Sequence, residues 1–156
     1  LDIMVIGEMR DEDTIIAALE VTDTGHKVFS TLHTSSTVES IDRIIAEVGE
    51  SEQTRVRHRL ADVLTAVISQ KLVPDLKGQL TMAKEVLIVT PNVRAAIKNN
   101  NTDEIYMMIN QAADLGMITM EHDLKQLYQN KIISYETALK FANNKVLFKQ
   151  ITGHSL

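Results

Sequence analysis

The sequence of 156 residues contains no cysteine. Without a thiol, the chain can form no disulfide bond, cysteine nucleophile or cysteine-bound zinc site. It is also poor in basic residues: 16 lysines and arginines stand against 21 acidic residues, which gives a formal net charge of −5. This balance argues against a broad nucleic-acid-binding surface, because such a surface needs concentrated positive charge.

Long hydrophobic runs are missing as well. The longest aliphatic run falls far short of the roughly 18 residues that a membrane-spanning helix needs. Hydrophobic residues make up 44% and charged residues 24% of the chain, a composition typical of a globular domain. We therefore expect a soluble cytoplasmic protein with one domain, or one domain plus a small appendage.

The chain opens on the dense apolar run Leu1-Asp2-Ile3-Met4-Val5-Ile6, which Gly7 ends. A short, continuous apolar run predicts a strand buried on both faces, as in a parallel sheet. Such a strand needs neighbours on both sides, and a domain seldom starts so abruptly and without a methionine. We therefore expect the chain to be a fragment of a longer protein.

Strand and helix patterns alternate over the first half of the chain, which predicts an α/β fold. In chain order, the predicted elements are a helix at 14–22, a strand at 27–32, a helix at 36–49, a long helix at 51–70 and an antiparallel strand pair at 71–74 and 80–89. Asp11 is the expected N-cap of the first helix, and acidic residues follow it in the first turn.

Near Thr90 the strand patterns give way to short amphipathic helices. Their expected spans are 91–99, 102–113, 120–130 and 134–143. The change predicts a boundary between a first subdomain, 1–89, and a helical subdomain, 90–156. The last stretch, 143–156, has little periodicity, so we expect it to be frayed.

The first candidate functional residue is Glu8, which follows Gly7 at the end of the apolar strand. A carboxylate fixed at the carboxyl end of a strand can hold Mg²⁺, or its water shell, against nucleotide phosphates, as in the Walker-B arrangement of P-loop ATPases. Open α/β sheets bind ligands at that edge. Taken alone, however, the pattern more often marks an ordinary strand followed by an acidic helix cap.

Two histidines, His26 and His33, flank the second predicted strand. Imidazole can hydrogen-bond a phosphate or relay its presence to a neighbouring group. A metal-binding pair is disfavoured, because no third ligand lies nearby at helical spacing. Two ordinary hydrogen-bonded histidines at the strand ends remain the alternative.

Together and in this order, the two stretches are specific. The sequence Gly7-Glu8-Met9-Arg10-Asp11, followed by Thr14, resembles the Walker-B box of the secretion-ATPase superfamily, which powers type II and type IV secretion and type IV pili. The stretch from Thr24-Gly25-His26 to Leu32-His33-Thr34 resembles the His box of the same superfamily, at the usual distance. A chance match of both boxes in register is rare.

The absence of cysteine narrows this resemblance. Assembly and type II secretion members carry a tetracysteine zinc element after the His box, whereas this chain continues to Thr90-Pro91 and the helix Val93-Arg94-Ala95-Ala96-Ile97-Lys98. That segment resembles the PilT-type pilus retraction ATPases of twitching motility, and so does 115–120. The similarity covers nearly the whole chain, most specifically residues 3–45 and 85–130.

The sequence departs mildly from the family pattern at Asp13, Lys27, Ser30, Val93 and Lys98, without loss of a functional group that the family needs. It contains no Gly-x-x-x-x-Gly-Lys-Ser/Thr P-loop, and the family's Asp box, arginine fingers and PAS-like N-terminal domain are absent too. The resemblance therefore implies the C-terminal half of a RecA-like ATPase core, followed by a helical subdomain.

The resemblance also implies roles for individual residues near the strand ends. Glu8 would be the Walker-B acid, contacting Mg²⁺ through water during catalysis. His33 would sense the γ-phosphate, with Thr31 and Thr34 fixing its tautomer. Arg10 would position the box or bind nucleotide, although a plain surface ion pair is the alternative. His26 would face the nucleotide or merely close a turn.

The resemblance to retraction ATPases implies that Arg94 and Lys98 bind a partner. They lie four residues apart on one predicted helix, where two like charges repel mildly and do not stabilise the helix. A docking surface for a partner or a neighbouring subunit explains them better, with a solvated basic face as the alternative.

For the whole protein, the resemblance implies a motor that hydrolyses ATP with Mg²⁺ to retract type IV pili. It would be a cytoplasmic homo-hexamer at the inner membrane, docked on the pilus platform protein, with no nucleic-acid partner and no membrane insertion. Without a P-loop, this chain alone is expected to lack ATPase activity. The alternatives are an assembly or type II secretion ATPase without the zinc element, and a non-catalytic module whose helical tail binds a partner.

Overall fold

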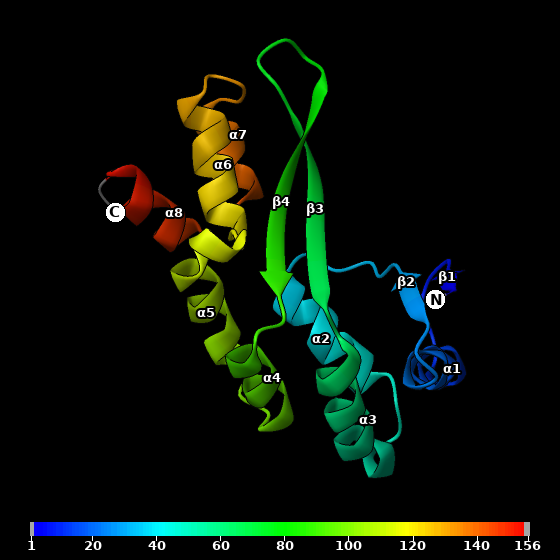
Figure 1. Ribbon diagram of the computed structural model, residues 1–156. Helices are drawn as coiled ribbons and strands as arrows, with labels where there is room; N and C mark the ends of the chain where they lie inside the picture. Colours follow the sequence, from blue (N-terminus) through cyan, green and yellow to red (C-terminus); the bar gives the residue numbers. More distant parts are fainter. Residues whose placement is uncertain (1, 155–156) are drawn as a thin grey trace. The chain divides into compact units, whose positions relative to one another are not determined.

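The computed structural model describes residues 2–154, which form two compact units. The first unit takes in the residues up to 34 together with 38–66 and 89–108, and the second takes in 35–37, 67–88 and the residues from 109 onward. Each unit contains one two-stranded sheet together with helices (Figure 1). The chain thus has the α/β fold that the sequence predicts.

The first unit begins with a β-α-β arrangement. Strands β1 (Ile3–Ile6) and β2 (Lys27–Ser30) pair in parallel, and helix α1 (Glu12–Asp23) connects them. The predicted cap is confirmed: the Asp11 side chain accepts a hydrogen bond from the Thr14 N–H at 2.8 Å. Because the pairing is parallel, the carboxyl ends of both strands meet at one edge of the sheet.

Strand β1 is exposed in this chain, whereas the sequence predicts that it is buried on both faces where neighbours lie on both of its sides, in a longer protein. Ile3 is 65% exposed and Val5 is 76% exposed, and Phe29 on the paired strand is 59% exposed. Among the described residues, β1 pairs with β2 alone. A continuous apolar run shows that a strand can be buried, whereas actual burial depends on the elements that cover it.

Helices α2 (Thr37–Ala46), α3 (Glu50–Val63) and α4 (Pro91–Lys98) supply much of the remaining core. Each presents apolar side chains at helical spacing on one face. The most buried of these are Ile41, Ile44, Ile45, Val56, Leu60, Val93 and Ile97. The Thr90 side chain caps α4 by accepting from the Val93 N–H, and Pro91 suits the first helical position.

The prediction of one helix over 51–70 was wrong for its last seven residues, 64–70. Helix α3 ends at Val63, Leu64 adopts an extended backbone with φ −64° and ψ 126°, and β3 (Ala66–Pro74) begins two residues later. Residues 66–70 fit a helical stripe and a strand equally well. Alternate side chains of β3 are buried, and pairing with the next strand decides between the two structures.

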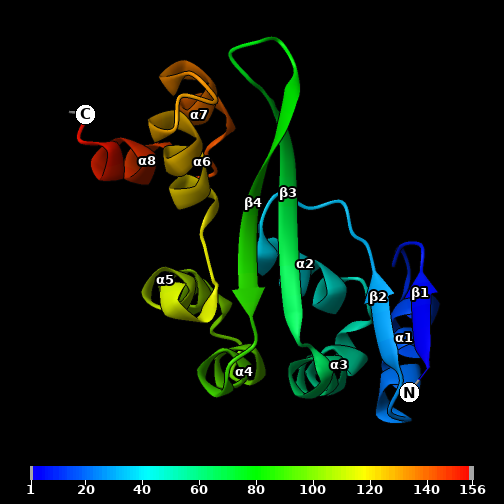
Figure 2. The ribbon, with the colours of Figure 1, turned by 45° about the horizontal axis from the view of Figure 1, so that its top comes forward.

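The second unit contains the hairpin of β3 and β4 (Leu80–Ile88). Figure 2 shows the two strands joined by a narrow turn. The Asp75 carboxylate forms this turn, because its Oδ1 accepts from the N–H groups of Lys77 and Gln79, both at 2.8 Å. One face of β4 packs against helix α6 (Met120–Gln129).

Helix α6 packs with α7 (Tyr135–Phe141) and α8 (Lys145–Thr152). The expectation of a frayed tail was wrong, because α8 is an ordered helix with a fully buried Phe148. Its first turn is capped by the Asn144 side chain, which accepts from the Leu147 N–H at 2.9 Å. This helix has only about two turns and one large buried side chain, so its hydrophobic pattern is too short to be recognised in the sequence.

Three short helices follow α4: η1 (Thr102–Glu104), α5 (Ile105–Gln111) and η2 (Ala113–Leu115), and the boundary between the two units falls within α5. The two compact units do not follow the expected boundary near Thr90. The hairpin belongs to the same unit as the C-terminal helices, and α4 belongs to the first unit. No helix among the described residues is long and apolar enough to cross a membrane.

Candidate functional site

The end of β1 holds Glu8 beside the end of β2. The Thr31 hydroxyl donates a hydrogen bond to the Gly7 carbonyl, and the Met9 N–H donates to the Thr31 carbonyl at 3.2 Å. These bonds continue the parallel pairing beyond both strands. The main chain on each side of Glu8 is therefore fixed, and its side chain, 29% exposed, lies at the carboxyl edge of the sheet.

Glu8 forms ion pairs with two of the residues that the sequence singled out. Arg10 Nη2 pairs with Oε1, and His33 Nε2 lies 3.2 Å from Oε2. The hydrogen bond from Arg10 lowers the pKa of Glu8, with further help from the charges of Arg10 and His33 against a partial desolvation. The same bond raises the pKa of Arg10. Glu8 is therefore a carboxylate at neutral pH.

One oxygen of this carboxylate remains able to accept a further bond. Glu8 Oε2 is shielded from solvent and receives no well-aligned hydrogen bond from the described residues, although His33 is close enough for charge attraction. Within the part of the chain that the structure describes, no group of three or more His, Cys, Asp or Glu side chains could hold a metal ion. A single carboxylate fits Mg²⁺ that is held mainly by water and phosphate oxygens.

The main chain at His33 is held more firmly than its ring. Arg43 Nη1 donates to the His33 carbonyl at 2.8 Å, while the His33 side chain is 81% exposed. The expectation that Thr31 and Thr34 fix the tautomer was wrong, because Thr31 donates to the main chain after β1 and Thr34 bonds to the Ser40 hydroxyl at 2.6 Å. The described partner of the ring is Glu8.

His26 lies at the opposite end of β2. Its Nδ1 is 2.8 Å from the Thr24 hydroxyl, and its Nε2 is 3.7 Å from Asp2 Oδ2. Asp2 precedes β1, so both partners belong to the amino-terminal edge of the sheet. The structure therefore brings together Glu8, Arg10 and His33, and it separates His26 from them.

Arg94 and Lys98 lie on α4, where both act on Asp62 of α3. Lys98 Nζ pairs with Asp62 Oδ1 at 2.6 Å, and this bond, followed by the charges of Arg94 and His58, lowers the pKa of Asp62. The premise that the two cations only repel each other was incomplete, since Asp62 offsets them. Asp62 was not predicted as part of this surface, although a lone acid after the basic residues of a helix is a usable signal in the sequence.

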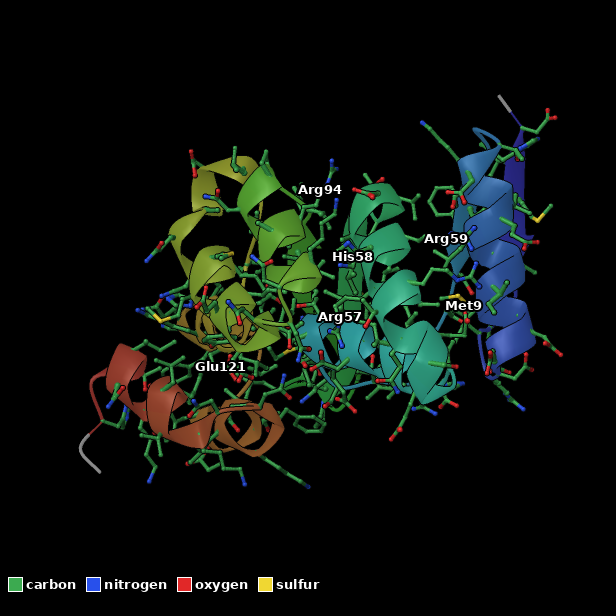
Figure 3. The ribbon with its side chains drawn as sticks, turned by 90° about the horizontal axis from the view of Figure 1, so that it is seen from below. Met9, Arg57, His58, Arg59, Arg94 and Glu121 are labelled. Carbon is green, nitrogen blue, oxygen red and sulfur yellow. The ribbon has the colours of Figure 1, made fainter. Side chains whose placement is uncertain are left out.

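The arginines of α3 differ in their surroundings. Arg59 extends from α3 toward α1, where it pairs with Asp23 at 2.5 Å (Figure 3). Arg55 pairs with Glu52 one turn earlier on the same helix. Figure 3 also shows Arg57 and His58 on α3 and Arg94 on α4. Arg59 therefore joins two helices of the first unit.

Comparison with known proteins connects this geometry to a family. The family model described as type II/IV secretion system protein matches residues 2–152. The type IV pilus retraction ATPase PilT of Pseudomonas aeruginosa is 40% identical over 137 residues, which are 88% of this chain and 40% of that protein. A twitching motility protein of Neisseria gonorrhoeae is 39% identical over 144 residues, which are 92% of this chain and 38% of that protein.

A solved structure gives the same result. The crystal structure of the pilus retraction motor PilT with bound ADP matches with a TM-score of 0.87 and 32% sequence identity, over 96% of this chain and 42% of that one. The chain thus spans about 40% of the length of the relatives that it matches. With a family model that covers nearly all of the sequence, the chain belongs to the type II/IV secretion system protein family.

Proposed function

We propose that this chain is the C-terminal portion of a motor that hydrolyses ATP to retract type IV pili. The observation that carries the proposal is the arrangement of Glu8, Arg10 and His33 at the carboxyl edge of the β1–β2 pair. Ligands of open α/β sheets bind at this edge. Similarity to PilT over nearly the whole chain supports retraction as the output.

Glu8 acts in this proposal as the Walker-B acid. When Mg²⁺ is bound with ATP, it neutralises charge on the phosphates. The shielded Oε2 of Glu8 has acceptor capacity left for a water of the metal's shell. Arg10 holds Oε1 and lowers the pKa of Glu8, which keeps the acid ionised in the presence of other negative charges.

His33 is proposed to report the terminal phosphate. Its ring is close to Glu8 and largely exposed, so it can turn toward an anion that enters beside the carboxylate. His26 was expected to bind nucleotide too, but it lies at the other edge beside Thr24 and Asp2. If the nucleotide binds beside Glu8, His26 lies too far along the strand to contact it, because it is at the opposite edge of the sheet.

The absence of cysteine favours retraction over assembly or type II secretion, since the zinc element of those members needs thiolates. A non-catalytic module that binds a partner through its helical tail is the second candidate. It is less well supported, because a carboxylate that faces both Arg10 and His33 at the carboxyl edge of the sheet is more than a structural cap requires.

The output of the motor is proposed to pass through α4 in a homo-hexamer on the cytoplasmic side of the inner membrane. Arg94 is exposed, and Asp62 holds the neighbouring Lys98 in place. The α4 surface therefore presents the exposed charge of Arg94 to a partner, for which we propose the platform protein of the pilus or a neighbouring subunit.

The test is Glu8→Gln in the full-length motor that carries this chain. The variant keeps the shape of the side chain and loses the charge, so we expect nucleotide binding to persist and the turnover of ATP to fall at least about tenfold. The control is Glu20→Gln, an exposed position on α1. Turnover like that of the control would show that Glu8 is only structural.

A further inference from the structure

Three large aliphatic side chains are exposed together at the tip of the hairpin. Leu76 in the turn is 61% exposed, Leu80 at the start of β4 is 66% exposed, and Ile132 between α6 and α7 is 38% exposed. The Leu76 N–H donates to the Ile132 carbonyl at 2.9 Å, so the turn and the loop lie side by side (Figure 1). Lys77 and Lys131 are their exposed neighbours in sequence. We call these five residues the tip cluster.

The backbone of the tip cluster is fixed before any partner arrives. In the turn, the Asp75 N–H donates to the Gln79 carbonyl at 2.8 Å, and Asp75 Oδ1 accepts from the Lys77 and Gln79 N–H groups. In the loop, Lys131 adopts a left-handed backbone with φ 58°, which few residues other than glycine favour. The aliphatic side chains are therefore held outward by ordered turns and not by a disordered segment.

The chemistry of the tip cluster suits a partner that is both apolar and negatively charged. Exposed aliphatic side chains that gather in one place mark an interaction surface. Neither Lys77 nor Lys131 has an ion pair among the described residues, and the nearby Asp75 uses its Oδ1 within the turn. The surrounding segment is also basic, since Lys125, Lys131, Lys140, Lys145 and Lys149 stand against a single acid, Glu136, in residues 124–154.

We propose that the tip cluster contacts an anionic lipid bilayer. Its aliphatic side chains enter the boundary between headgroups and acyl chains, and its lysines pair with lipid phosphates. A cytoplasmic loop of a membrane protein is a poorer partner, because such loops carry an excess of lysine and arginine that would repel these lysines. The contact is small and reversible, and it does not depend on the ATPase function proposed above.

Flotation with vesicles tests this proposal on the 156-residue chain. We expect the chain to float with vesicles of 30% phosphatidylglycerol in phosphatidylcholine, and to stay behind with phosphatidylcholine alone or in 0.5 M NaCl. At about 1 kcal/mol for each lysine near an anionic surface, the double variant Lys77→Gln/Lys131→Gln should weaken binding about 30-fold. Leu76→Gln/Ile132→Gln should weaken binding to a similar or greater extent.

Two matched variants control for general adhesion. Ile68→Gln removes an aliphatic side chain that is 59% exposed elsewhere on the hairpin, and Lys27→Gln removes an exposed lysine of the first unit. Both should bind like the parent chain. Equal binding to neutral and anionic vesicles, no binding to either, or tip variants that bind as well as these controls would each overturn the proposal. Thermal unfolding followed by circular dichroism verifies that every variant is folded.

Discussion

Replacement of Glu85 tests what holds the second unit together. This carboxylate on β4 is 1% exposed. Its Oε1 accepts from the N–H of Thr37 at 2.9 Å and from the hydroxyl of Thr37 at 2.8 Å, and its Oε2 accepts from the N–H of Met120 at 3.2 Å. Thr37 and Met120 are the first residues of α2 and α6. One carboxylate therefore serves the N-termini of two helices, where N–H groups lack helical partners and negative charge is favoured.

The magnitude follows from the number of donors that would be left without an acceptor. In Glu85→Ala, three buried donors lose their partner, and each unsatisfied group costs about 1–3 kcal/mol. Some water can enter the space, so we expect the free energy of unfolding to fall by about 4 kcal/mol. In Glu85→Gln, one oxygen survives for Thr37, while the amide meets the Met120 N–H as a second donor. That variant should lose about 2 kcal/mol.

Urea denaturation of the chain measures both values, with Tyr128 and Tyr135 as reporters because they lie on α6 and α7 of the second unit. Glu136→Gln on α7 is the control, since this residue is exposed, and it should change the stability by less than about 0.5 kcal/mol. If Glu85→Ala stays within about 1 kcal/mol of the parent chain at an unchanged m-value, the two helix N-termini do not depend on this carboxylate. If the alanine variant does not fold at all, the glutamine variant carries the comparison.

Three further predictions concern other parts of the chain. In a ¹³C NMR titration, the pKa of the Glu8 carboxyl should lie below its usual range, and Arg10→Gln should raise it. Because folding lowers this pKa, the ion pair stabilises the fold at pH values above the unfolded-state pKa. The stabilisation is lost as the pH falls through the folded-state pKa. An unchanged midpoint in the variant would contradict this assignment. Phe148→Ala should destabilise the second unit by about 3–5 kcal/mol in urea, whereas a frayed tail would show almost no loss. Arg94→Ala in the full-length motor should leave ATP hydrolysis largely intact and impair twitching on a surface. If hydrolysis and twitching both fall, α4 belongs to the catalytic assembly. If neither changes, the basic face of α4 is only solvated.

Local signals account for the parts of the fold that the sequence predicted correctly. Asp11 caps α1 as predicted, and its side chain accepts a hydrogen bond from the N–H of Thr14, only three residues further along the chain. The apolar spacing of α2 and α4 likewise depends on residues within the same helix. Such features need no knowledge of the rest of the structure, so they can be recognised in sequence.

The errors lie where distant segments decide the outcome. Residues 66–70 became a strand because β4 pairs with them, although their spacing also continued the stripe of α3. Phe148 ordered the last helix because side chains from the hairpin and from α6 and α7 form a core that receives it. Asp62 entered the basic surface of α4 from another helix. In each case the deciding partner lies many residues away, and a single sequence does not reveal it.

The candidate site combines both kinds of information. His26 and His33 are placed symmetrically about one strand in the sequence, and their chemistry alone does not tell them apart. Parallel pairing does, because it brings the end of β2 to the end of β1 and leaves the start of β2 beside Asp2. His33 consequently reaches Glu8 at 3.2 Å, whereas His26 meets a carboxylate at the opposite edge. In the proposed function, a phosphate sensor shares an edge with the acid that contacts the metal through water, so strand direction, more than residue type, favours His33 over His26 for the proposed role.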